Sequence, residues 1–202
     1  VLADDNFATI VSAVAEGRNI YDKMVKSARY LLSCNTGEIV AVFLAITLRF
    51  PLPLTPLQIL LMNLVTDGIP AMGLSAEPPE GDVMKRPPRS PGEKPINLAS
   101  MLLVLVFGVV MGLGTLFIFN LFLERGVDLA RTAAFTTLVM FEMFAVLGSR
   151  SLLPFRKLNP FSNQWLLGGV LLSIAIQAAI IYFAPLQHVF GTVPLGIHEW
   201  GR

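Results

Sequence analysis

Residues 30–48, YLLSCNTGEIVAVFLAITL, form an apolar run that carries an amide and a carboxylate, Asn35 and Glu38, near its middle. A helix of about 20 residues, at about 1.5 Å each, matches a hydrocarbon core about 30 Å thick. A charged side chain at mid-membrane costs about 2.5–3.5 kcal/mol on insertion scales. Polar groups there are therefore shielded from lipid, paired with another polar group or part of a functional site. The stretch therefore predicts a transmembrane helix whose two polar groups need a partner.

The composition of the whole chain agrees with a membrane protein. Its 202 residues are 54% hydrophobic and only 14% charged, and the mean hydropathy is +0.66. A soluble domain is usually about 25% charged. Because the apolar residues fall into blocks, we expect an all-α polytopic helical bundle. The net charge of +1 says nothing about nucleic-acid or acidic partners, and no nucleic-acid partner is expected. A single cysteine, Cys34, forms no disulfide within the chain.

Five apolar blocks predict five spans, at about 28–48, 57–74, 98–121, 131–148 and 164–184. Residues 1–27 are amphipathic and charged, and no helix breaker separates them from the first span. We therefore expect one long helix, a stalk outside the bilayer that continues into the first span. The proline-rich stretch 75–97 predicts an extended loop. Residues 185–202 are expected to form an extracytoplasmic tail that leads to a last helix missing from the chain.

Lysine and arginine residues predict the orientation of the chain. Eleven of them lie in the N-terminal segment and in the loops near 85–94 and 150–157, whereas the alternate loops hold only Arg49, Arg125 and Arg131. Basic loops remain in the cytoplasm. The stalk and both basic loops are therefore predicted to be cytoplasmic, in an integral, multi-pass membrane protein.

Three of the fourteen acidic residues lie inside predicted spans, and these are Glu38, Asp67 and Glu142. No lysine or arginine lies deep in a span to neutralise them, which indicates a cation site. A proton would neutralise them when no cation is bound.

The spacing of further polar residues supports such a site. Asn35 lies three residues before Glu38, and Asn63 and Thr66 share a helix face with Asp67. Carboxylate, amide and hydroxyl oxygens are hard donors, which suit Ca²⁺ better than thiolate-binding metals.

Glycine and proline residues accompany the polar ones. Gly68 and Pro70 are predicted to break the second span just after its acidic residue and to free backbone carbonyls beside the site. Gly37 in the first span and the pair Gly108 and Gly112 in the third predict a close approach of these helices. That approach is either ordinary tight packing or a pivot at Gly37.

Each polar residue taken alone also has a purely structural interpretation. Asn35 or Asn63 can form hydrogen bonds between helices, and Thr66 can bond back to its own helix. Glu142 can be a protonated structural acid. Gln177, in the last span, is expected to join helices, and Cys34 is expected to be a small apolar filler.

Several motifs, in order, resemble the C-terminal part of a P-type cation ATPase of the calcium-pump kind. They are VLADDNFATIVSAVAEGRNIYDKM (1–24), NTGE (35–38), NLVTDGIPA (63–71), MKRPPR (84–89) and FEMF (141–144). The resemblance implies that the stalk joins a phosphorylation domain to the ion sites and that the spans are the fifth to ninth of ten. It also implies that ATP and Mg²⁺ bind to domains missing from the chain. The implied partners are the lipid bilayer and the rest of the same pump, namely its phosphorylation, nucleotide-binding and actuator domains, first four helices and last helix.

The resemblance also assigns ligands for a transported Ca²⁺: Asn35, Glu38, Asn63, Thr66, Asp67 and Glu142. It places Asp67 at a bridging position between two ions. Retention of both glutamates resembles the sarco/endoplasmic-reticulum-type pumps. Sodium/potassium pumps carry aspartate where Asn63 stands, and the intramembrane arginine of proton pumps is absent here.

The implied function is export of Ca²⁺ from the cytoplasm, coupled to ATP hydrolysis in the missing domains. The chain itself has no phosphate-binding loop or nucleophile for that hydrolysis. The alternatives are a P-type pump for Na⁺, H⁺ or Mn²⁺, a secondary cation transporter that uses the same carboxylates, and a membrane fragment that only associates with other subunits.

Overall fold

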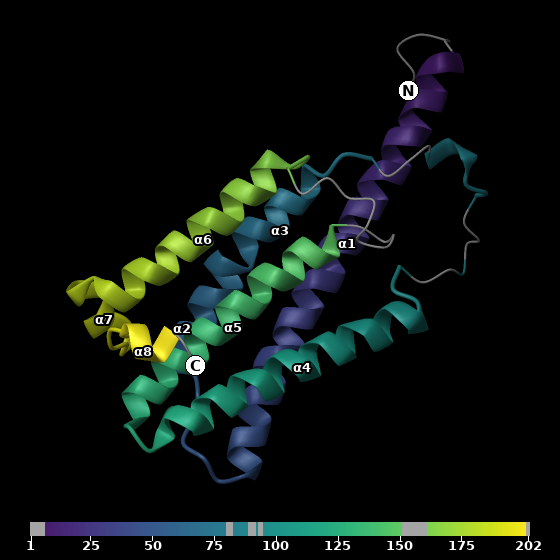
Figure 1. Ribbon diagram of the computed structural model, residues 1–202. Helices are drawn as coiled ribbons and strands as arrows, with labels where there is room; N and C mark the ends of the chain where they lie inside the picture. Colours follow the sequence, from purple (N-terminus) through teal and green to yellow (C-terminus); the bar gives the residue numbers. More distant parts are fainter. Residues whose placement is uncertain (1–6, 80–82, 89–91, 93–94, 151–160, 201–202) are drawn as a thin grey trace.

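The computed structural model describes residues 7–79, 83–88, 92, 95–150 and 161–200, and this part of the chain is helical without β-strands (Figure 1). Five described segments are long and apolar enough to cross a membrane: Phe7–Thr47, Pro56–Ser75, Leu98–Leu123, Val127–Ser149 and Gln164–Tyr182. They confirm the all-α polytopic bundle. Parts of the predicted stalk, proline-rich loop and tail lie outside the described residues.

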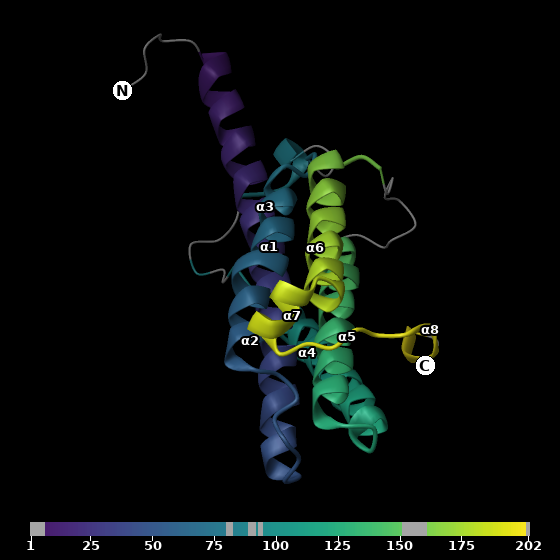
Figure 2. The same cartoon turned by 90° about the vertical axis from the view of Figure 1, so that its left-hand side faces the viewer.

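Helix α1 (Phe7–Thr47) is continuous, and its N-terminal part projects beyond the other helices in both views (Figures 1 and 2). The face that it buries in the bundle repeats every three or four residues, at Tyr30, Cys34, Glu38, Ala41 and Ala45. This is the period of an α-helix. The N-terminal half instead leaves most of its apolar side chains exposed.

The described part of the proline-rich loop contacts the projecting part of α1. A 3₁₀ turn, Val83–Lys85, is its only described helical element. Arg18 donates hydrogen bonds to the carbonyl oxygens of Val83 (2.9 Å) and Arg86 (2.8 Å), and Arg86 forms an ion pair with Asp22 at 2.5 Å. The loop is therefore ordered against the stalk at these residues.

The second span consists of α2 (Pro56–Leu61), a π-helical turn (Met62–Thr66) and α3 (Gly68–Ser75). The Asp67 amide donates a hydrogen bond of 2.8 Å to the carbonyl of Met62, five residues earlier in the chain. The span is thus irregular, but the irregularity precedes Asp67 and does not follow it as predicted. Pro70 has no N–H to donate to the Thr66 carbonyl, so a regular α-helical ladder cannot run through this point.

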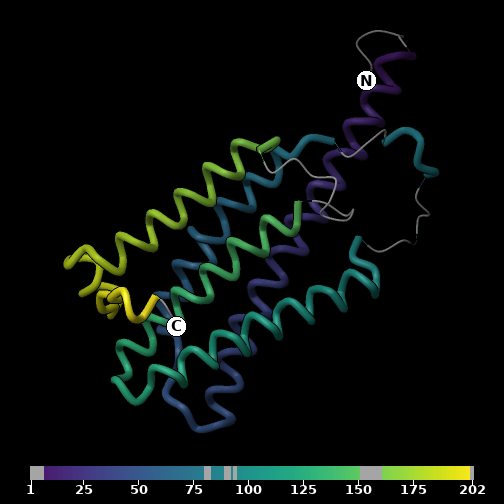
Figure 3. Tube along the Cα trace, viewed as in Figure 1, coloured from purple at the N-terminus to yellow at the C-terminus, as the bar shows by residue number. Residues whose placement is uncertain are grey.

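Helix α4 (Leu98–Leu123) crosses α1 in close contact (Figure 3). The glycines lie at this crossing: a Cβ atom added to Gly112 would lie 2.6 Å from Val40 Cγ1 and 2.8 Å from the carbonyl oxygen of Gly37. A Cβ on Gly37 would lie 3.1 Å from the Cβ of Met111. Tight packing therefore accounts for the glycines at this crossing. Gly68 differs, since the nearest atom to its added Cβ is 3.8 Å away.

Substitution of Gly112 is expected to destabilise the bundle. The Gly112→Ala variant should lose about 1–3 kcal/mol of stability, because the new methyl group meets backbone as well as side chain. Gly168→Ala is the matched control, since an added Cβ there has nothing within 4 Å. Thermal unfolding of the full-length protein in detergent measures both. Equal melting temperatures for the two variants would contradict the close helix crossing.

Helices α5 (Val127–Ser149) and α6 (Gln164–Tyr182) complete the five long segments. Helix α5 starts earlier than the predicted fourth span, so Arg131 lies within the helix and donates to the Leu52 carbonyl at 3.0 Å. Gln177 donates to Thr136 Oγ1 at 3.1 Å and joins α6 to α5, as expected.

The described part of the tail folds back on the bundle. It contains two short helices, α7 (Ala184–Phe190) and α8 (Ile197–Trp200). Gly191, at φ 64°, ends α7 in the left-handed conformation that glycine adopts readily. Gln58 donates to the Phe190 carbonyl at 3.0 Å. Sequence reasoning did not anticipate these helices.

Candidate cation site

Three carboxylates from three segments are buried inside the bundle. Glu38 lies on α1 and is 5% exposed, whereas Asp67, between the π-helical turn and α3, and Glu142, on α5, are completely buried. Asp67 Oδ2 and both oxygens of Glu142 have no hydrogen-bond partner among the described residues. A buried acceptor without a partner is unfavourable and calls for an explanation. A bound cation or a proton would supply one.

The carboxylates of Asp67 and Glu142 lie close together, and the thiol of Cys34 lies beside them. One ligand atom from each of these three buried residues is within 4.8 Å of the other two. The Tyr30 hydroxyl donates to Asp67 Oδ1 at 2.9 Å and fixes one side of that carboxylate. The other oxygen, Oδ2, is left for a ligand.

Glu38 is paired with an amide. Asn63 Nδ2 lies 2.9 Å from Glu38 Oε1 and 2.8 Å from Oε2, and it also donates to the Ile59 carbonyl at 3.0 Å. These bonds join α1 to the π-helical turn. Because rotation of the Asn63 amide exchanges its nitrogen for its oxygen, the same pair can present oxygens to a cation.

The remaining two predicted ligands use their polar groups within their own helices. Thr66 is completely buried, and its hydroxyl donates to the Met62 carbonyl at 3.3 Å. Asn35 Nδ2 donates to the Leu31 carbonyl at 2.8 Å. The structure thus joins Glu38 to Asn63 and Asp67 to Glu142, whereas the Asn35 amide nitrogen bonds within α1.

Sequence reasoning missed Tyr30 and the position of Cys34. Both residues share a helix face with Glu38, because Tyr30, Cys34 and Glu38 follow one another at intervals of four residues. This spacing was a signal that could have found them. Cys34 was expected to be an apolar filler, but its sulfur lies beside two carboxylates.

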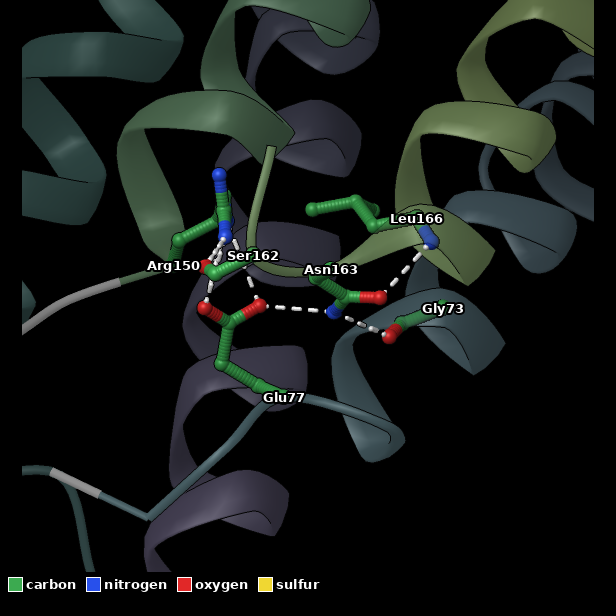
Figure 4. Close-up of polar contacts among 6 residues, drawn as sticks. All are labelled: Gly73, Glu77, Arg150, Ser162, Asn163 and Leu166. Carbon is green, nitrogen blue, oxygen red and sulfur yellow. Dashed lines mark hydrogen bonds and ion pairs between the residues drawn. The ribbon is translucent and has the colours of Figure 1, made fainter. Parts of the chain in front are cut away.

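A second buried polar cluster joins the end of α3, the end of α5 and the start of α6. Glu77, just after α3, lies between the Arg150 guanidinium at the end of α5 and the Asn163 amide at the start of α6 (Figure 4). Arg150 Nη2 lies 3.0 Å from Glu77 Oε1, and Asn163 Nδ2 lies 2.6 Å from Oε2. All three side chains are buried. The ion pair connects the segment after Asp67 with the helix that carries Glu142.

Five apolar helical segments around converging, partly unpartnered carboxylates define an α-helical membrane protein with a buried acidic site. Residues 51–202 match the family described as cation transporting ATPase, C-terminus. The chain belongs to this family of P-type cation-transporting ATPases, and it forms part of the C-terminal region of such an enzyme.

The relatives that the chain matches include three calcium-transporting ATPases. It is 46% identical over 203 residues to that of Bacillus subtilis (strain 168), a match that covers 99% of the chain and 23% of the relative. It is 39% identical to calcium-transporting ATPase 1 of Bacillus cereus, a match that covers 100% of the chain and 25% of the relative. It is 37% identical to the endoplasmic reticulum-type calcium-transporting ATPase 3 of Arabidopsis thaliana, a match that covers 99% of the chain and 23% of the relative. The chain thus spans about a quarter of the length of these relatives.

Proposed function

We propose that the chain forms the ion-translocating part of an ATP-driven pump that exports Ca²⁺ from the cytoplasm. The observation that carries the proposal is the set of buried, unpartnered oxygens on Asp67 and Glu142. The names of the relatives support Ca²⁺ as the ion. ATP and Mg²⁺ would bind to parts of the full-length protein outside this chain.

The proposed ligands can meet the demands of Ca²⁺, which takes about six to eight oxygens at about 2.3–2.6 Å. Asp67 and Glu142 would supply the negative charge, and Glu38 with Asn63 would supply a carboxylate and an amide oxygen. Thr66 and Asn35 would add a hydroxyl and a second amide oxygen. The Asn35 amide nitrogen donates to the Leu31 carbonyl, so the amide oxygen is the atom that would bind the ion.

The decisive experiment is a titration of phosphoenzyme formation by the full-length protein in isolated membranes. Calcium ions are expected to switch on phosphorylation by ATP, whereas Na⁺, Mn²⁺ or a change of pH is not expected to replace them. Phosphorylation that responds to one of these other cations would support an ATP-driven pump but would show that Ca²⁺ is not the transported ion. A protein that transports Ca²⁺ without forming a phosphoenzyme would instead be a secondary transporter.

We also propose that α1 transmits domain movement to the site. The helix runs without a break from Phe7 to Thr47, and it carries Glu38 in its second half. A small displacement of the helix would shift the Glu38 oxygens and disrupt coordination of the ion. Residues 7–27 would then be the cytoplasmic stalk.

Insertion of two glycines after Glu16 is expected to uncouple phosphorylation from transport. Glycine is about 1 kcal/mol less favourable than alanine in a helix, so the pair weakens the stalk outside the bundle. Calcium-activated phosphorylation and Ca²⁺ uptake into vesicles are measured on the same membranes. Insertion of two alanines at the same point is the control for length and rotation of the helix. Full transport with the glycine pair would rule out a rigid stalk.

A further inference from the structure

We infer that the cation site also binds a soft divalent cation, such as Cd²⁺ or Zn²⁺, through the Cys34 thiolate together with Asp67 and Glu142. This inference rests on the proposed function for the role of the two carboxylates. It adds a sulfur ligand to a site whose other proposed ligands are all oxygens. Cys34 would then set which competing metals the pump admits.

The first support is the placement of the sulfur. Cys34 Sγ and one carboxylate oxygen each from Asp67 and Glu142 lie within 4.8 Å of one another, and all three residues are buried. Around a tetrahedral Zn²⁺, with bonds of about 2.3 Å to sulfur and 2.1 Å to oxygen, such atoms lie about 3.6 Å apart. The three side chains therefore need only a small contraction to enclose one ion, and less for the larger Cd²⁺.

The second support is the unmet bonding capacity of the carboxylates. Asp67 Oδ2 and both oxygens of Glu142 are buried without a partner, although the Tyr30 hydroxyl already occupies Asp67 Oδ1. These free oxygens belong to the same residues that approach the sulfur. A divalent cation bound there would meet two carboxylates and one thiolate, with the thiol proton released on binding.

The third support is the chemistry of the ligands. Soft thiolate ligands favour Zn²⁺ and similar metals, whereas Ca²⁺ prefers oxygen. Asn35, the neighbouring residue that sequence reasoning assigned to the site, bonds within its own helix at 2.8 Å. Of the three ligand atoms that lie within 4.8 Å of one another, the Cys34 sulfur is the one that α1 contributes.

The test uses Cd²⁺ on the purified full-length protein and on its Cys34→Ser variant, which keeps nearly the same volume. Titration of the native protein is expected to produce an ultraviolet cadmium–thiolate charge-transfer band, and the variant should lose one equivalent of it. The Cd²⁺ concentration that halves calcium-activated phosphorylation should rise at least about tenfold in the variant, because the soft ligand is gone.

Thr115→Val, at a buried threonine of α4 outside the cluster, is the matched control and should retain the full band. An unchanged band and unchanged Cd²⁺ inhibition in Cys34→Ser would overturn the inference, even if Ca²⁺ still activates the pump. Loss of the band in Cys34→Ser with no activation by Ca²⁺ in either protein would support the sulfur ligand and instead refute the proposed Ca²⁺ function.

Discussion

Asp67→Asn is expected to abolish activation of phosphorylation by Ca²⁺ at concentrations that saturate the unchanged protein. The substitution keeps the shape of the side chain but removes one negative charge from a completely buried position. Loss of one partner from a buried charge interaction costs about 3–5 kcal/mol, which corresponds to about two to three and a half orders of magnitude in affinity. The apparent affinity for Ca²⁺ in the phosphorylation assay measures this loss.

The effect on the cation must be separated from an effect on folding. Tyr30 donates to Asp67 Oδ1, an oxygen that asparagine retains, so the hydrogen bond at 2.9 Å can persist in the variant. Thr115→Val supplies a control at a completely buried hydroxyl that has no partner among the described residues. Both variants should still fold, and the melting temperature of the full-length protein in detergent measures this. An Asp67→Asn protein with unchanged Ca²⁺ affinity would exclude Asp67 from the site.

Hydrophobic patterning was enough to predict the bundle, because a membrane span must be long, apolar and helical. The five long segments follow from it, whereas the continuous first helix followed from the absence of a helix breaker and the close helix crossing from the spacing of the glycines. Local deviations from ideal helix geometry were not predictable in the same way. Gly68 and Pro70 predicted an irregular second span. Only the hydrogen bonds of the structure show that the irregularity is a π-helical turn before Asp67, from Met62 to Thr66.

The candidate site shows where one-dimensional reasoning is limited. Acidic residues in apolar runs identified Glu38, Asp67 and Glu142 correctly as buried, since such residues are rarely tolerated without a purpose. Which neighbour on α1 faces them depends on helix rotation, and one residue corresponds to 100° of a turn. That rotation directs Cys34 toward the Asp67–Glu142 pair, whereas Asn35 bonds within its own helix.

The buried ion pair beyond α3 could not be predicted, because its partners are 73 residues apart and both looked like loop residues. Basic residues near 150 were assigned to a cytoplasmic loop from their charge alone, which does not predict burial. In the structure, Arg150 is only 3% exposed. Long-range pairing of this kind depends on how helix ends meet, which hydropathy does not describe.

Glu77→Ala is expected to destabilise the bundle by about 3–5 kcal/mol, because it leaves the Arg150 guanidinium buried without its carboxylate. It also removes one acceptor from the Asn163 amide, which still donates to the Gly73 carbonyl at 2.9 Å. The melting temperature of the full-length protein in detergent measures the loss. Glu124→Ala, at an exposed acid after α4, should change stability by less than about 0.5 kcal/mol.

A double substitution shows whether the charge or the packing matters. Replacement of a buried ion pair by apolar residues of similar size is often neutral or stabilising, so Glu77→Leu with Arg150→Met should recover much of the stability lost in Glu77→Ala. If the pair also sets the distance between α3 and α5, the double variant should regain stability but keep a weakened Ca²⁺ response, since leucine and methionine fix no hydrogen-bond geometry. Recovery of both the stability and the Ca²⁺ response in the double variant would limit the ion pair to a structural role. A Glu77→Ala protein as stable as the unchanged one would show that Arg150 is not held by Glu77.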